Sequence, residues 1–235
     1  MAQRESRTAR LERCRQAVEQ SPGSAVAHYN LGLALQKMGR FQEAEQAYVK
    51  AVELEPTLAE AWVNLGGVRL HSWDFEGCLA ASLRAVELRD DLVLAHHNLG
   101  QAYLEEKNYP EAINWFRTSL SRNKDYPDPY LGLGEALVGA GRLEEAVAQL
   151  EAGVAAVPGD PGLHLALGQA LFRAGRFTEA RPQLEEAMKK DPAGPVGRAA
   201  ANRLESPHSL QVLRTTPPES HHSPGIHYEP RSAHA

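Results

Sequence analysis

Three asparagines are the side chains whose spacing best suits binding to another molecule. Asn30, Asn64 and Asn98 each stand immediately before a Leu-Gly pair, thirty-four residues apart in succession. An amide offers both a hydrogen-bond donor and an acceptor, so such a series can pair with the backbone of an extended peptide whatever its sequence. The alternative is that each amide is only solvated on an exposed helix face. The spacing therefore suggests the hypothesis that these asparagines bind a peptide.

Histidines could bind metal or transfer protons, but their placement favours packing. His96 and His97 are adjacent on a predicted helix, so they point in different directions, which suits neither shared metal ligation nor a proton relay. His28, His96 and His164 share a position of the thirty-four-residue pattern with large aromatic residues, so we expect them to pack. We therefore predict no metal site among them.

The sequence carries none of the common catalytic motifs. It lacks the GxSxG nucleophile elbow, the phosphate-binding GxxxxGK[ST] loop and the HExxH zinc motif. Its many glutamates fall at positions expected on solvated helix faces. We therefore expect a protein that is not an enzyme, with no catalytic residues and no cofactor.

Composition narrows the class of partner and the compartment. The formal net charge is −5, whereas nucleic-acid binders concentrate Lys and Arg on one face. Cys14 and Cys78 are too few for a disulfide framework and lack zinc-ligand spacing. No long apolar stretch follows the basic start, so neither a signal peptide nor a membrane helix is predicted. We expect a cytoplasmic protein that binds neither nucleic acid nor membrane.

The elements that position these side chains repeat along the chain. AHYNLGLAL around Asn30 recurs as AWVNLGGVR and AHHNLGQAY, and the same register continues in YLGLGEAL and HLALGQAL. Within each unit, small and apolar residues fall at helical spacing in two blocks separated by a turn, which is typical of an amphipathic helix pair. Five units are predicted, at 25–58, 59–92, 93–126, 127–160 and 161–194.

Small residues in these units indicate close helix crossings. A Gly at a crossing point lets two helix backbones approach, so Gly32 is expected to meet the face containing Ala44, and Gly66 to meet Cys78. Gly39 can adopt the left-handed conformation that ends a helix, and Pro56 closes the first unit. One hairpin cannot bury its apolar stripe alone, so stability must come from stacking.

The positions of these residues resemble the tetratricopeptide repeat. The second unit has Trp62, Leu65-Gly66, Phe75 and Ala85 at the family's characteristic places, whereas Cys78 and Ser82 depart from its pattern. The resemblance covers about four fifths of the chain. It implies an all-α fold, a right-handed solenoid of five hairpins with capping helices, whose first helices line a concave groove.

That resemblance also implies where a protein or extended peptide would bind. The Asn series is similar to the asparagine ladder in the superhelix preceding the O-linked N-acetylglucosamine transferase domain, and it stops at Gly132 and Ala166. The chaperone-tail carboxylate clamp of other family members is disfavoured, because Tyr29 and Leu94 occupy places that need basic residues. The predicted partner-binding residues are Tyr29, Asn30, Lys37, Asn64, His71, His97, Asn98 and Gln101. Further groove positions are Leu33, Val63, Gly67, Glu105, Leu131, Glu135, Gln169 and Arg173.

Two functions remain open at this point. The first is a stand-alone scaffold or adaptor that binds a protein or peptide partner in the groove, with self-association possible. The second is a regulatory or substrate-recruiting subunit of an enzyme such as a glycosyltransferase or methyltransferase. A repeat specifies a surface and does not name its ligand.

The ends of the chain differ from the repeats. Residues 1–24 are predicted to contain an N-terminal capping helix, and residues 195–205 a short helix that covers the last hairpin. Residues 206–235 are rich in Pro, Ser and His with little apolar periodicity, so we expect disorder. The tail histidines could bind a soft metal weakly, although a flexible His-bearing segment is the simpler interpretation.

Overall fold

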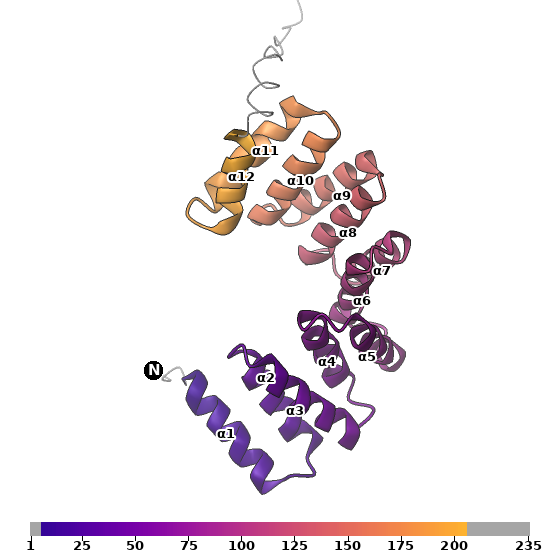
Figure 1. Cartoon of the computed structure of the whole chain (residues 1–235), viewed down its shortest axis with the longest axis vertical. Helices are drawn as coiled ribbons and strands as arrows, with labels where there is room; N and C mark the ends of the chain where they lie inside the picture. Colours follow the sequence, from indigo (N-terminus) through magenta and orange to yellow (C-terminus); the bar gives the residue numbers. More distant parts are fainter. Residues whose placement is uncertain (1–5, 206–235) are drawn as a thin grey trace, which may run out of the picture.

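The computed structural model describes residues 6–205, and within that span the chain forms twelve α-helices and no strand (Figure 1). The predicted disordered tail lies outside the described residues. The helices are α1 (Arg7–Gln20), α2 (Ala25–Gln36), α3 (Phe41–Leu54), α4 (Ala59–His71), α5 (Phe75–Leu88), α6 (Val93–Glu105), α7 (Tyr109–Arg122), α8 (Asp128–Gly139), α9 (Leu143–Ala156), α10 (Pro161–Arg173), α11 (Phe177–Lys190) and α12 (Pro195–Glu205).

The helices stack as consecutive hairpins, which confirms the all-α solenoid predicted from the sequence. Each of the pairs α2/α3, α4/α5, α6/α7, α8/α9 and α10/α11 packs along its length, while α1 packs on α2 and α12 on α11. From α4 onward, the first helix of each hairpin also contacts the first helix of the next. The second helices pack much less on one another, so the stack bends, and α4, α6, α8 and α10 lie on its inner side (Figure 1).

Glycines at the hairpin crossings make room for a large side chain from the second helix. A Cβ on Gly32 would lie 2.5 Å from the Tyr48 ring, so Gly32 approaches the helix that carries Ala44 at a large residue one turn further along. Gly100 faces Phe116 in the same way, and Gly168 faces Leu184. Glycine is needed at this position because the large side chain sixteen residues later lies directly against the first helix.

The second hairpin departs from this pairing because Ser82 stands where the others have a large residue. A Cβ on Gly66 would lie 2.4 Å from Ser82 Oγ and 3.4 Å from the carbonyl oxygen of Cys78. The predicted approach of Gly66 to Cys78 is confirmed, although Ser82 is the nearer neighbour. This hairpin therefore crosses closely without an aromatic side chain between its helices.

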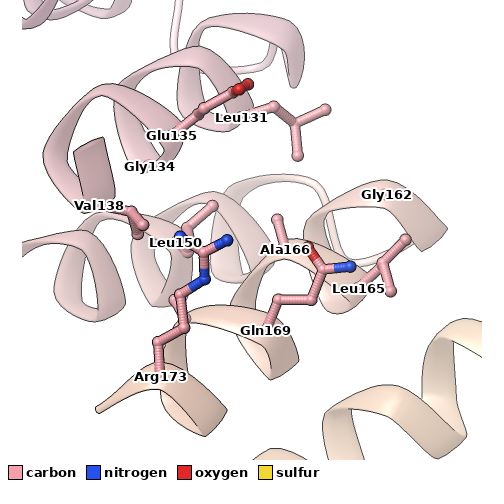
Figure 2. A pocket seen from close by; sticks show the side chains of 11 residues that line it. Leu131, Gly134, Glu135, Val138, Leu150, Gly162, Leu165, Ala166, Gln169 and Arg173 are labelled. Carbon is pink, nitrogen blue, oxygen red and sulfur yellow. The ribbon is translucent and has the colours of Figure 1, made fainter. Parts of the chain in front are cut away.

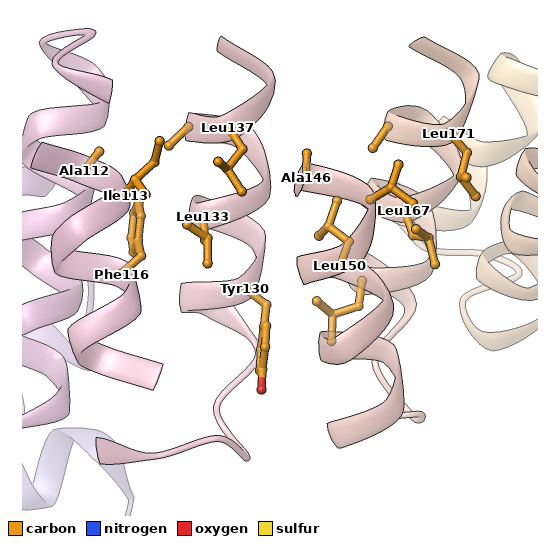
Figure 3. Close-up of a cluster of buried hydrophobic side chains, with 14 of the residues drawn as sticks. Ala112, Ile113, Phe116, Tyr130, Leu133, Leu137, Ala146, Leu150, Leu167 and Leu171 are labelled. Carbon is orange, nitrogen blue, oxygen red and sulfur yellow. The ribbon is translucent and has the colours of Figure 1, made fainter. Parts of the chain in front are cut away.

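The apolar core follows the stack and is uneven along it. A large cluster extends through the C-terminal hairpins and includes Phe116, Leu133, Leu150 and Leu167 (Figure 3). A second cluster, around Tyr48, joins α1 to α4 and α5. Between them, where α5 meets α6, the cluster is small, and its buried members are Val63, Ala85 and Ala95. The helices nevertheless pack on one another there, since α6 contacts both α4 and α5.

Within residues 6–205 no helix is both long enough and apolar enough to cross a membrane.

Candidate functional site: the inner face of the helical stack

The three asparagines of the predicted series lie in different environments. Asn30 on α2 is exposed. Asn64 on α4 is partly buried, and its Nδ2 donates to Glu60 O at 2.9 Å and to the Tyr29 hydroxyl at 3.3 Å. Asn98 on α6 is only 7% exposed, and its Nδ2 donates to Val63 O at 3.1 Å. The series therefore passes from a solvated amide to one that joins two neighbouring hairpins.

Asn98 is buried because it occupies space left by Ser82. The position of Asn98 in its repeat corresponds to Gly132 in the next, where an added Cβ would lie 2.3 Å from Phe116 Cζ. Phe116 is the counterpart of Ser82. Phe116 thus faces a glycine, whereas the smaller Ser82 leaves room for the Asn98 side chain. Asn98 therefore packs between hairpins as well as lying in the asparagine series.

The histidines that share the aromatic position make one recurring hydrogen bond. The Nε2 atoms of His28, His96 and His164 lie 2.9, 2.8 and 3.3 Å from the carbonyl oxygen six residues earlier. Trp62 Nε1 donates in the same way to Pro56 O at 2.9 Å. A ring N–H at this position thus ties the helix start to the preceding turn, so these histidines have a structural role.

The remaining predicted residues fall into separate groups. Tyr29 and Asn64 line a crevice of about 270 Å³ together with Leu94, which is 48% exposed. His71 and Gln101 line another, between α4 and α6. Lys37 is exposed at the end of α2. The structure does not gather the predicted residues into a single site.

His97 is more enclosed than its position in the series indicated. Its ring centroid lies 5.8 Å from that of Phe116 and 5.6 Å from that of Tyr126. Its Nδ1 is buried without a hydrogen-bond partner. Burial lowers the pKa of His97 below its ordinary value of 6.5, and the nearby Asp128 opposes that shift. The neutral imidazole is therefore the form that the folded chain favours.

A further crevice on the inner face lies between α8 and α10, beyond the asparagine series. Its volume is about 410 Å³, and Figure 2 shows Leu131, Glu135 and Val138 on one side facing Leu165, Ala166 and Gln169 on the other. Leu150 from α9 contributes to its floor. The lining is therefore apolar at depth, with Glu135, Gln169 and Arg173 as its exposed polar residues.

Small residues explain why this crevice is open. Ala166 holds the position that Asn98 holds in α6, and Gly162 holds that of Leu94. Gly162 has no side chain and Ala166 has only a methyl group, whereas the longer Asn98 side chain reaches α4 and donates to Val63 O. The crevice therefore exists because the asparagine series has ended.

Four lining residues, Leu131, Glu135, Gln169 and Arg173, are groove positions predicted from the repeat register. Val138, Leu165 and Ala166, which complete the lining, are not among the predicted residues. The sequence does indicate the crevice in one way. At the repeat position of Asn98, the next two hairpins have the smaller residues Gly132 and Ala166, which leave more space on the inner face.

Candidate metal ligands and the Cys78 thiol were the remaining groups with possible chemistry. Residues 6–205 contain no group of three or more His, Cys, Asp or Glu side chains able to hold a metal ion. Burial raises the pKa of the Cys78 thiol to about 11, and its Sγ lies 3.7 Å from Asn98 O. A protonated, enclosed thiol is a poor nucleophile.

Comparison with known proteins identifies the repeat. Family models of the tetratricopeptide repeat match residues 25–58 and 131–195, and a further TPR repeat model matches residues 100–141. No curated protein sequence gives a significant match.

Solved structures share the fold at low sequence identity. YrrB, described as a TPR protein with an unusual peptide-binding site, is 19% identical, with a TM-score of 0.61 over 82% of this chain and 99% of its own. Pseudomonas aeruginosa pilF is 20% identical, with a TM-score of 0.67 over 82% of this chain and 90% of its own. MamA is 22% identical, with a TM-score of 0.61 over 72% and 92%. The chain belongs to the tetratricopeptide-repeat family.

Proposed function

We propose that this protein is a scaffold that binds an extended segment of a partner protein along its inner face, with the α8–α10 crevice as the principal site. The observation that carries the proposal is the apolar floor of that crevice, which is open on the side where the first helices meet. A solenoid presents such an inner surface to extended ligands. The described relatives include a protein with a peptide-binding site, and membership of the family supports a protein-interaction role.

The crevice favours a particular kind of peptide. Leu131, Val138 and Leu165 can surround one apolar side chain, whose burial contributes roughly 1.5–3 kcal/mol. Glu135 and Arg173 are exposed on opposite sides of that floor (Figure 2). A segment with an apolar residue between a basic and an acidic group would complement both charges.

The predicted N-terminal residues form a second part of the proposed surface. Exposed Asn30, together with Tyr29, Lys37 and Asn64, can pair with a peptide backbone that continues from the crevice along the inner face. Asn98 contributes less, because it is buried and its Nδ2 donates to Val63 O. The Asn64 Nδ2 also has partners, so Asn64 would pair with a peptide through its Oδ1. The enzyme-subunit alternative remains compatible with the same surface, since the partner could be a glycosyltransferase or methyltransferase.

A displayed library of random peptides, selected for binding to the full chain, tests the proposal. We expect the enriched peptides to share an apolar residue and to lose at least about tenfold in affinity when Ala166→Asn fills the crevice. The fold should accept that change, because asparagine occupies the same repeat position in three other hairpins, at Asn30, Asn64 and Asn98. Glu151→Gln, an exposed outer-face substitution, is the matched control. Equal binding of the parent and Ala166→Asn chains would contradict the proposal.

A further inference from the structure

Trp73 stands in a backbone conformation that favours glycine. The loop after the first helix of a hairpin has a residue with positive φ in all five repeats, and three of these residues are Gly39, Gly141 and Gly175. Trp73 has φ of 63° at the same position. Left-handed backbone is costly for residues with a Cβ. The second hairpin therefore accepts strain that a glycine would relieve.

Burial of the indole does not compensate for that strain. The Trp73 side chain is 73% exposed, more than the other exposed large hydrophobic residues of the described part. Its ring meets Phe75 edge to face, with centroids 5.9 Å apart, and leaves its other surfaces open. A large, strained and exposed aromatic residue contributes little to folding, so its side chain is available for binding.

The crevice beside Trp73 contains an unsatisfied acceptor and a carboxylate. The crevice measures about 230 Å³ and is lined by Leu70, His71, Trp73, Phe75, Gln101 and Glu105. Gln101 Oε1 is buried and accepts no hydrogen bond. Glu105 is exposed, and no Lys or Arg is among these lining residues. The crevice thus combines aromatic surface with acceptors, and it lacks an opposing cation.

These features match an arginine side chain better than other ligands. A guanidinium group stacks on an indole, carries a positive charge and presents several donors in one plane. It could stack on Trp73 and pair with Glu105, and it could donate to Gln101 Oε1 once that amide turns from its enclosed position toward the crevice, whereas an acidic ligand would be repelled by Glu105. We propose that this crevice between α4 and α6 binds an arginine of a partner protein, at a site separate from the α8–α10 crevice.

The test uses a blocked Gly-Arg-Gly peptide titrated at millimolar concentration into the ¹⁵N-labelled full chain. We expect saturable shifts of the Trp73 indole N–H and the Gln101 side-chain amide. A blocked Gly-citrulline-Gly peptide, which has the same shape without the charge, should give none, and the lysine analogue should bind at least about threefold more weakly.

Two substitutions at equivalent positions separate binding from backbone strain. Trp73→Gly and Lys107→Gly both place glycine at a positive φ, of 63° and 59° respectively, so both should raise the thermal midpoint. Only Trp73→Gly should abolish the arginine-dependent shifts. Gln101→Leu, which removes the acceptor and retains the volume, should weaken them.

Three results would overturn the assignment: no saturable shift at Trp73, an equal response to the citrulline peptide, or an unchanged response in Trp73→Gly. Ala166→Asn should leave this titration unaltered although it blocks the crevice of the proposed function. Failure at one site is therefore distinguishable from failure at the other.

Discussion

At the scale of single residues, Asn98 shows that one repeat position can serve two purposes. The same position is solvated in Asn30, shared with a neighbouring tyrosine in Asn64 and enclosed between hairpins in Asn98. A regular spacing in sequence therefore does not guarantee a regular environment, because the preceding hairpin decides how much room each residue has.

Alanine substitutions should separate these environments. Asn98→Ala removes the buried bond to Val63 O, and we expect it to lower the free energy of unfolding by roughly 1–3 kcal/mol. Asn30→Ala should leave stability unchanged or slightly higher, since the side chain is exposed and alanine favours helix. Chemical denaturation of both variants measures the difference. Equal effects of the two substitutions would show that Asn98 has no structural role.

The pairing of Ser82 with Asn98 is open to a double-mutant cycle. Ser82→Phe alone should overpack against the enclosed amide, and Asn98→Gly alone should leave a void. Together they recreate Phe116 facing Gly132, so the double variant should be more stable than the sum of the single changes by about 0.5–3 kcal/mol. Additive effects, measured by the same denaturation experiment, would contradict complementary packing.

At the scale of helices, the sequence predicted what depends on local pattern. Apolar periodicity placed two helices in each repeat, and Gly39 ends α2 with φ of 73° as its turn position indicated. Contacts between repeats were less predictable. Gly32 faces Tyr48, sixteen residues away, and the α8–α10 crevice depends on side-chain volumes at Leu150 and Ala166, which come from different hairpins.

Enclosure of His97 between α6 and the segment leading to α8 should make stability depend on pH. Because burial lowers the pKa of His97 in the folded chain, the unfolded chain binds more protons below about pH 6.5. The stability from the neutral imidazole is therefore present above that pH and is lost as the pH falls through the lowered value. We expect the thermal midpoint to fall less between pH 7 and pH 5.5 in His97→Gln than in the parent.

One result of that comparison would contradict the prediction. Carboxylates titrate mainly below this range, so they affect both chains alike. Parallel midpoint curves for the parent and His97→Gln would mean that enclosure between Phe116 and Tyr126 does not keep the imidazole neutral.

At the scale of the whole molecule, the stack presents more than one crevice. Both halves have a crevice with apolar residues in its lining: the α8–α10 crevice measures about 410 Å³, and the crevice lined by Tyr29, Asn64 and Leu94 about 270 Å³. A small cluster of buried apolar residues, Val63, Ala85 and Ala95, lies between them. In a solenoid, stability is close to a sum of local interfaces, so different parts of the stack can differ in stability.

Photocrosslinking in the cells that naturally express the protein tests the proposed inner-face binding most directly. A photoreactive benzoylphenylalanine at Gln169 would report on the crevice, and the same residue at Glu151 on α9 would report on the outer face. We predict that Gln169 forms a discrete covalent adduct with a partner protein and that Ala166→Asn abolishes it, while Glu151 forms none. An adduct from Glu151 alone, or one from Gln169 that persists with Ala166→Asn, would contradict binding in the α8–α10 crevice.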